Sequence, residues 1–333
     1  MAFMPQFSLL HPSSAADAVA LLAANADSRF LAGGTDLLPN IRRGLLAPPV
    51  LIDLGGISEL REVRAEAGML TIGAGVSLAT IAADARVQQQ LPALAQAALA
   101  VAGPTHRAAA TLGGNLCLDT RCQYYNQSEV WREGNSFCMK RAGDTCRVAP
   151  KSDRCYAAFS GDVAPALLAL DATVQLLGPQ GTRRLPIRDF YRDDGMAWLA
   201  LAADEMLLAV EVPLVEDWVS TYEKVSVRGA IDFPLAGVAV ALRRDGDVIG
   251  ELRIACTGIS SRPELIDELD ALIGKPLDEA SFTLIDKRIR RCTQPMETTV
   301  INVAYRRRVA PVLTKRLLQK LWEINREINK ESR

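Results

Sequence analysis

The chain has 333 residues, 49% of them hydrophobic, which is enough apolar material for two or three domains with packed cores. Its 38 basic and 39 acidic residues nearly cancel, whereas a nucleic-acid-binding protein would show a basic excess. No apolar run reaches the roughly 20 residues of a membrane span and the amino terminus lacks a secretion signal, so we expect a cytoplasmic protein with neither a nucleic-acid nor a membrane partner.

Short apolar runs alternate with alanine-rich segments through the first half of the chain. The alanine-rich segments, one opened by a serine cap and one by a proline, predict helices at 13–25, 77–90 and 92–102. The apolar runs, bounded by glycine, predict strands at 30–32, 50–53 and 69–74. A short helix that runs into a strand is expected at 163–178. This alternation predicts an α/β or α+β domain, which we place at residues 1–215.

From residue 206 onward, the predicted strands come first and the predicted helices follow. The strands are expected at 206–214, 219–228, 235–243 and 248–257, and the helices at 261–273, 278–291 and 302–329. Strands and helices that are segregated in this way are typical of an α+β domain, which we expect to span residues 216–333.

Residues 118–159 have no helical or strand period and carry many charges. A structureless loop of this length inside a compact domain is improbable unless something else organises it. Five of the seven cysteines, Cys117, Cys122, Cys138, Cys146 and Cys155, lie in or next to this segment. In a reducing cytoplasm, such crowding indicates metal binding before disulfide bonds.

Two glycine pairs lie in similar settings. Gly33-Gly34 follows a predicted strand and precedes Thr35 and Asp36, and Gly113-Gly114 lies between Thr111 and Asn115. Consecutive glycines allow positive φ and let backbone N–H groups converge on an anion such as a pyrophosphate. A structural turn is the commoner explanation of one such pair alone, and neither pair matches the G-x-G-x-x-G dinucleotide motif.

Six segments in a fixed order resemble the FAD-binding subunits of the molybdenum hydroxylases, the group of the xanthine and carbon monoxide dehydrogenases. They are AGGTDL, ATLGGN, SGDVAPALLALDA, LLAVEVP, YEKVSVR and AYRRR, and the resemblance covers nearly the whole chain apart from 118–159. It implies the α+β fold class, with a two-lobed FAD-binding domain followed by a C-terminal α+β domain. It also implies bound FAD and no acid–base catalytic residue in this chain.

The resemblance further implies which residues contact FAD. The first phosphate segment corresponds to Arg29, Phe30, Leu31, Ala32, Gly33, Gly34, Thr35 and Asp36, and the second to Thr111, Gly114 and Asn115. The remaining positions are Val101, Asp162, Leu207 and Lys224, with the aliphatic residues beside the flavin ring and the lysine at its electron-rich edge. Asp162 could instead cap the helix that begins after it, and Lys224 could be an ordinary exposed strand lysine.

The cysteine-rich segment is an insertion relative to the family. Cys117 falls where members without an insert often have a cysteine, which leaves Cys122, Cys138, Cys146 and Cys155 in the spacing C-x15-C-x7-C-x8-C. Four thiolates suit a [4Fe–4S] cluster or a structural zinc ion, and the spacing matches neither the ferredoxin run nor zinc knuckles. The flavin context favours the [4Fe–4S] cluster because zinc cannot change its oxidation state.

With such an insert, the chain is similar to the flavin subunits of the 4-hydroxybenzoyl-CoA reductase branch of the family. This similarity implies that electrons pass from a ferredoxin-like donor through the [4Fe–4S] cluster and FAD to a small subunit with two [2Fe–2S] clusters. They end at the molybdenum cofactor of a large subunit, where 4-hydroxybenzoyl-CoA is reduced to benzoyl-CoA. A dimer of heterotrimers is the implied assembly.

Two alternatives remain open. In the first, the chain is the FAD subunit of a hydroxylase or dehydrogenase of the xanthine, carbon monoxide or aldehyde type, and the electrons flow outward from FAD. In the second, the insert is a structural zinc module without a role in electron transfer.

Overall fold

A computed structural model describes residues 4–331, with side chains described up to residue 324. Its strands form three sheets. The first is parallel, in the order β1 (Ser8–Leu10), β3 (Val50–Asp53), β2 (Arg29–Leu31). The second is antiparallel, in the order β4 (Val63–Glu66), β5 (Met69–Gly73), β8 (Met206–Pro213), β6 (Thr173–Gly178), β7 (Gly181–Pro186). The third is antiparallel, in the order β12 (Glu264–Leu265), β11 (Val248–Thr257), β10 (Ala236–Asp245), β9 (Val219–Val225).

Short helices connect the strands of the first two sheets. They are α1 (Ala15–Ala24), α2 (Leu37–Arg42), α3 (Leu78–Ala83), α4 (Ala85–Gln90), α5 (Pro92–Ala100), α6 (Pro104–Ala109), α7 (Leu112–Leu116), α8 (Glu129–Gly134), α9 (Val163–Ala169) and α10 (Ile187–Phe190). Single-turn 3-10 helices occur at η1 (Leu54–Gly56) and η2 (Ser58–Arg61). The predicted serine cap is present, since the amide of Asp17 donates to the Ser14 hydroxyl at 3.1 Å.

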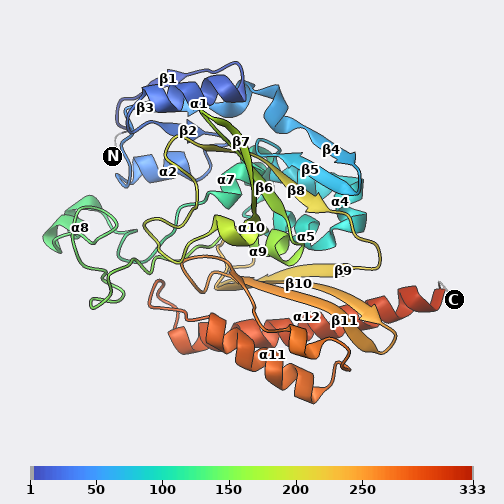
Figure 1. Ribbon diagram of the computed structural model, residues 1–333. Coiled ribbons are helices and arrows are strands. Elements are labelled where there is room, and N and C mark those ends of the chain that lie inside the picture. The colour runs from blue at the N-terminus through green and yellow to red at the C-terminus, as the bar shows by residue number, and fades with distance from the viewer. Residues whose placement is uncertain (1–3, 332–333) are drawn as a thin grey trace.

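Helices α5 and α9 lie between the five-stranded sheet and the C-terminal sheet (Figure 1). One continuous core contains α9, buried throughout, together with Val210 of the five-stranded sheet and Ala239 and Ala241 of β10. The alternate residues of β10, including Val238 and Val240, pack on the opposite face against α11 (Glu279–Cys292) and α12 (Val303–Glu331). This period-2 pattern buries both faces of the C-terminal sheet.

The structure confirms the predicted fold class, a two-lobed unit of sheets and helices followed by a C-terminal α+β unit. Two predicted elements are wrong. The helix predicted over 77–90 is broken at Asp84, whose carboxylate accepts the amide of Arg86 at 2.9 Å and starts a new helix. The helix predicted over 261–273 is instead strand β12 and the 3-10 turn η3 (Asp270–Leu272), because residues 264 and 265 pair with β11.

The long helix α12 begins where the sequence predicts it. No helix in the described part of the chain combines the length and the apolar character that crossing a membrane requires.

Candidate functional site

The two glycine segments, far apart in the sequence, are in contact in the fold. Gly33 follows β2, and a Cβ atom added to it would clash with the carbonyl oxygen of Ala109, at the end of α6. Ala110 comes next in the chain, and Thr111 after it opens the second segment. Only glycine permits this close approach at position 33, so the pairing of the two segments is built into the sequence.

The glycines themselves adopt different conformations in the two segments. Gly34 has φ +68°, as the predicted anion nest requires. The second segment is not a nest, which corrects the prediction, because Gly113 and Gly114 lie in the first turn of helix α7. The Thr111 hydroxyl caps this helix by accepting the amide of Gly114 at 3.1 Å.

The second glycine segment also contacts the central sheet and helix α9. The amide of Gly113 donates to the carbonyl of Ala74 at 2.8 Å, and the amide of Ala74 donates to the carbonyl of Leu208 in β8 at 2.9 Å. The buried side-chain oxygen of Asn115 accepts the amide of Val163 at 3.2 Å. Residues 111–115 therefore join β5, β8 and the start of α9.

Asp162 and Lys224 form a buried ion pair. The Lys224 ammonium lies 3.0 Å from one carboxylate oxygen of Asp162, and the Tyr222 hydroxyl donates to the same carboxylate at 2.7 Å. Burial raises the pKa of Asp162 and the nearby ammonium opposes this rise. Both alternatives from the sequence are wrong, since Asp162 makes no side-chain cap and Lys224 is largely buried.

The other predicted FAD-contacting residues lie on several elements. Leu207 is buried in β8, and Val101 is half-buried against the same core at the end of α5. Arg29, Phe30 and Leu31 form strand β2, which leads into Gly33.

The insert, residues 118–159, projects from the body of the molecule and carries α8 at its outer end (Figure 1). It is closed at its base by a pair of backbone hydrogen bonds between Arg121 and Ala158, of 2.9 and 2.8 Å. Inside it, the guanidinium of Arg132, only 2% exposed, donates to the carbonyls of Tyr125, Gln127 and Gly44. A buried arginine of α8 thus holds together neighbouring chain segments that have no regular secondary structure.

Four cysteines of the insert converge. Cys122, Cys138, Cys146 and Cys155 are all buried, and all four line one small cavity. The Cys122 sulfur accepts the amide of Tyr125 at 3.3 Å and the Cys155 sulfur accepts that of Ala157 at 3.4 Å. A hydrogen bond between Cys146 and Cys155 lowers the pKa of Cys146 to about 5. The same hydrogen bond and burial raise the pKa of Cys155, and burial raises the pKa of Cys122. Without a bound cation, Cys146 is therefore the thiol of this hydrogen-bonded pair that ionises first.

The other cysteines lie apart from this cavity. Cys117 packs against the main core, and burial raises its pKa to about 12. Cys256 and Cys292 contact the C-terminal core.

The lining of the cavity suits an iron–sulfur cluster by its chemistry. Four thiols are the ligands that such a cluster requires, and a zinc ion would take the same four. Among residues 4–324, no three His, Cys, Asp or Glu side chains are already arranged as a metal ion requires, so the thiols must move to bind either group. The negative charge of a cluster also suits the cationic residues Lys140 and Arg147, which line the same cavity.

An ionic contact that the sequence did not predict joins the insert to the first glycine segment. The Arg121 guanidinium lies 3.4 Å from the carboxylate of Asp36 and also donates to the side chain of Asn40. Arg121 directly precedes Cys122. Asp36 thus faces the base of the insert as well as the glycine segment to which the resemblance assigned it.

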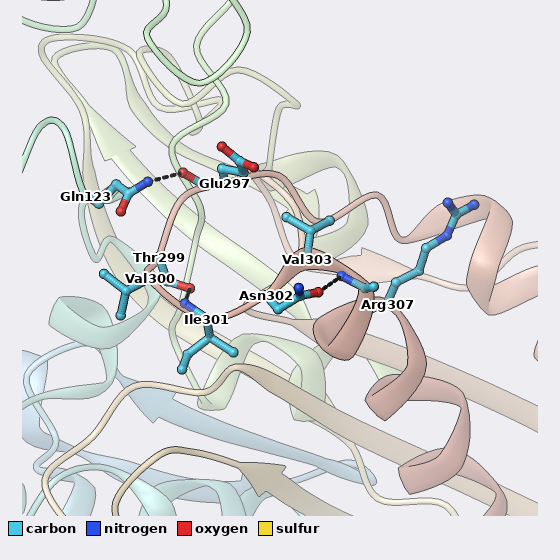
Figure 2. A pocket seen from close by; sticks show the side chains of 9 residues that line it. Gln123, Glu297, Thr299, Val300, Ile301, Asn302, Val303 and Arg307 are labelled. Atoms are coloured by element: carbon cyan, nitrogen blue, oxygen red, sulfur yellow. Dashed lines mark hydrogen bonds between the residues drawn. The ribbon is translucent and has the colours of Figure 1, made fainter.

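A separate surface cavity of about 690 Å³ lies between the base of the insert and the segment that leads into α12 (Figure 2). There the amide group of Gln123 donates to the carbonyl of Glu297 at 3.1 Å. This hydrogen bond attaches the insert to the C-terminal unit. None of the predicted FAD or metal residues lines the cavity, so it is not the proposed site.

Comparison with known proteins identifies the class. Residues 5–215 match the family described as "FAD binding domain in molybdopterin dehydrogenase", and residues 220–321 match "CO dehydrogenase flavoprotein C-terminal domain". The chain therefore belongs to the FAD-binding subunits of the molybdenum hydroxylase family, and it is a flavoprotein.

Individual relatives show which members of this family the chain is similar to. The chain is 33% identical to the aldehyde oxidoreductase FAD-binding subunit PaoB of Escherichia coli (strain K12), over 77% of this chain and 82% of that one. It is 30% identical to the carbon monoxide dehydrogenase medium chain of Hydrogenophaga pseudoflava, over 96% and 98% of the two chains. A solved structure of carbon monoxide dehydrogenase from that organism matches with a TM-score of 0.80 and 26% identity, covering 96% of this chain and 99% of that one.

These relatives bear on the predicted activity. Their names refer to aldehydes and carbon monoxide, and they favour the outward-flow alternative over the reduction of 4-hydroxybenzoyl-CoA. The name of the first relative mentions FAD, and neither name mentions an iron–sulfur cluster. The cluster is therefore a hypothesis that depends on the four cysteines of this chain.

Proposed function

We propose that this chain is the electron-transfer flavoprotein subunit of a molybdenum hydroxylase of the aldehyde or carbon monoxide type, and that its insert adds a [4Fe–4S] cluster to the FAD. The observation that carries the second part is the convergence of four buried cysteines on one cavity beside the first glycine segment. Its partners would be a large subunit with the molybdenum cofactor and a small subunit with [2Fe–2S] clusters. A dimer of such heterotrimers is the assembly we expect.

The FAD-binding residues are proposed from the family match and from the contacts described above. The segments 29–36 and 111–115 would bind the phosphates. The first would use the backbone amides around its glycines, and the second would use the Thr111 hydroxyl and the Asn115 side-chain amide, because the backbone amides of 112–115 already donate within the protein. Val101 and Leu207 would form the apolar wall of the ring site. Lys224, with Asp162 holding its ammonium group in place, would present a positive charge to the ring. We retain residue 215 as the proposed boundary between this domain and the C-terminal one.

FAD, when bound, supplies both one- and two-electron redox chemistry, and the protein contributes binding, orientation and electrostatics. In the insert, Cys122, Cys138, Cys146 and Cys155 would hold the cluster. The amides of Tyr125 and Ala157 would donate to the sulfurs of Cys122 and Cys155, which stabilises their charged form.

Reduction of 4-hydroxybenzoyl-CoA is the second candidate, and the same insert is what favours it. An aromatic hydroxyl group resists reduction, so this reaction requires a strong donor such as a ferredoxin, and iron–sulfur clusters reach low potentials. In the outward-flow reaction, the electrons would leave the FAD toward NAD⁺, a quinone or oxygen, and the cluster would be a side branch or an exit.

Metal analysis of the anaerobically purified protein tests the cluster. We expect about four iron atoms, four sulfides and one FAD per chain, with no stoichiometric zinc. Replacing any one of Cys122, Cys138, Cys146 and Cys155 by serine should remove most of the iron and leave the FAD. The matched control is Cys256→Ser, outside the insert, which should leave both unchanged.

Two outcomes would contradict the cluster. Stoichiometric zinc without iron would make the insert a structural module, and iron loss in Cys117→Ser but not in Cys122→Ser would show that one ligand is misassigned. The direction of electron flow is decided separately by redox titration. A cluster potential well above that of FAD supports outward flow, and one below it supports the reductive candidate.

A further inference from the structure

Lys140 is a buried cation at the wall of the four-cysteine cavity. Its side chain is only 6% exposed, and it lines the cavity together with the four cysteines. It follows Cys138 by two positions, in the turn where the amide of Met139 donates to the carbonyl of Thr145 at 3.1 Å. The side chain therefore reaches the cavity from the same loop that carries Cys138, one of the proposed ligands.

The contacts of Lys140 hold the ammonium group in one place. It donates to the carboxylate of Asp119 at 2.7 Å and to the carbonyl oxygens of Thr120 at 3.0 Å and Gly195 at 2.6 Å. The nitrogen also lies 5.1 Å from the ring centre of Tyr125 and 4.8 Å from that of Trp198. A cation enclosed by a carboxylate, carbonyls and two aromatic faces is held in a fixed position.

Burying such a charge inside the protein costs free energy unless a nearby anion pairs with it. One carboxylate, Asp119, neutralises it in part, and Asp119 itself is 16% exposed in its side chain. The cavity that Lys140 lines is also lined by the four cysteines, whose thiolates would be the nearby anion.

We propose that Lys140 is a positioning residue that sets the reduction potential of the cluster held by the four cysteines. This inference depends on the proposed [4Fe–4S] cluster. A cluster bound by four thiolates is already anionic, and gaining one electron from a one-electron donor makes it more so. A fixed cation stabilises the reduced form more than the oxidised form and thus raises the potential.

Lys140 also connects the cluster cavity to the flavin side of the insert. Asp119 and Thr120 lie three and four residues after the end of helix α7, and Arg121 after them contacts Asp36 of the first segment. The lysine therefore fixes the loop of Cys138 against the chain that leads to the proposed FAD site. Loss of its charge should alter the potential, and loss of its contacts should loosen this connection.

The test is an anaerobic redox titration of the purified complex, followed by low-temperature EPR of the cluster, for the wild type and Lys140→Met. The substitution removes the charge and keeps the aliphatic chain. We expect at least a tenfold change in the reduction equilibrium, a fall of about 59 mV for one electron. Lys140→Arg should keep most of the wild-type potential. The control is Lys151→Met, an exposed lysine of the same insert that does not line the cavity, and it should leave the potential unchanged.

A Lys140→Met variant with full iron content and an unchanged potential would overturn the inference. If Lys140→Met loses its iron, Asp119→Asn decides, because it removes the opposing charge and leaves the ammonium group. A higher potential in that variant supports the role of Lys140, and an unchanged one contradicts it. Absence of iron from the wild type would be a different result, since it would refute the proposed cluster itself.

Discussion

Gly114 is an exposed residue with free space beside it in the folded chain. A Cβ atom added there would meet only the hydroxyl of Thr111, at 3.1 Å, so a larger side chain does not disturb the core. If this backbone approaches the FAD phosphates, Gly114→Val will block it. We expect FAD content to fall about tenfold or more, since a loss of ~1.4 kcal/mol in binding already gives that factor. The measurement is the flavin absorbance of the purified protein per chain.

The matched control is Gly134→Val, because Gly134 has no atom within 4 Å of an added Cβ and lies in α8, at the outer end of the insert. It should keep its FAD. Full FAD occupancy in Gly114→Val would remove this residue from the proposed site.

At the scale of elements, strand β9 and helix α9 are joined by the pair of Lys224 and Asp162. Lys224→Met would leave a buried carboxylate without its cation, which typically costs about 3–5 kcal/mol of the free energy of unfolding at neutral pH. Burial already raises the pKa of Asp162, and loss of the ammonium raises it further. The folded variant then binds a proton that the unfolded chain releases near pH 4, so its stability falls as pH rises. The destabilisation should therefore be larger at pH 7 than at pH 5.

Urea unfolding at the two pH values, in excess FAD, measures this effect. The double variant Lys224→Met with Asp162→Asn removes the buried charge and should recover most of the loss. If the double variant is as unstable as the single one, the loss comes from a missing FAD contact and not from the unpaired carboxylate.

Some elements were predictable from the sequence because their signals are local. The serine cap at Ser14, the alanine-rich helix α5 and the alternating strand β10 depend on neighbours within a few positions. The insert was not predictable in this way. Its order comes from Arg132 and Arg121, whose partners lie on segments distant in the sequence, and nothing in a charge-rich stretch distinguishes a buried arginine from an exposed one.

The site shows the same division. The glycine pairs and the four cysteines can be recognised from the sequence as residue types. The resemblance to the family then assigned the glycine segments to FAD and the cysteines to an insertion. The contact between Gly33 and Ala109 and the roles of Lys140 and Asp119 emerge only from the fold, since each joins residues that the sequence separates by a helix or a loop.

At the scale of the whole molecule, the insert is attached to the rest of the chain at several points. It leaves the chain after α7, closes on itself at Arg121 and Ala158, and returns to α9, whose core packing is shared with both neighbouring sheets. Phe159 then anchors it to the C-terminal unit, with its amide donating to the carbonyl of Ser260 at 3.0 Å. The insert, with its four-cysteine cavity, is thus attached to the first glycine segment, to α2 and to the C-terminal unit.

The central claim, that the insert holds an iron–sulfur cluster beside the flavin, is tested most directly by anomalous diffraction from crystals of the complex at the iron and zinc absorption edges. We predict strong iron signal centred in the cavity between Cys122, Cys138, Cys146 and Cys155, with no zinc signal there. Zinc at that position, or no anomalous signal within the cavity of a protein whose flavin is fully bound, would contradict the account.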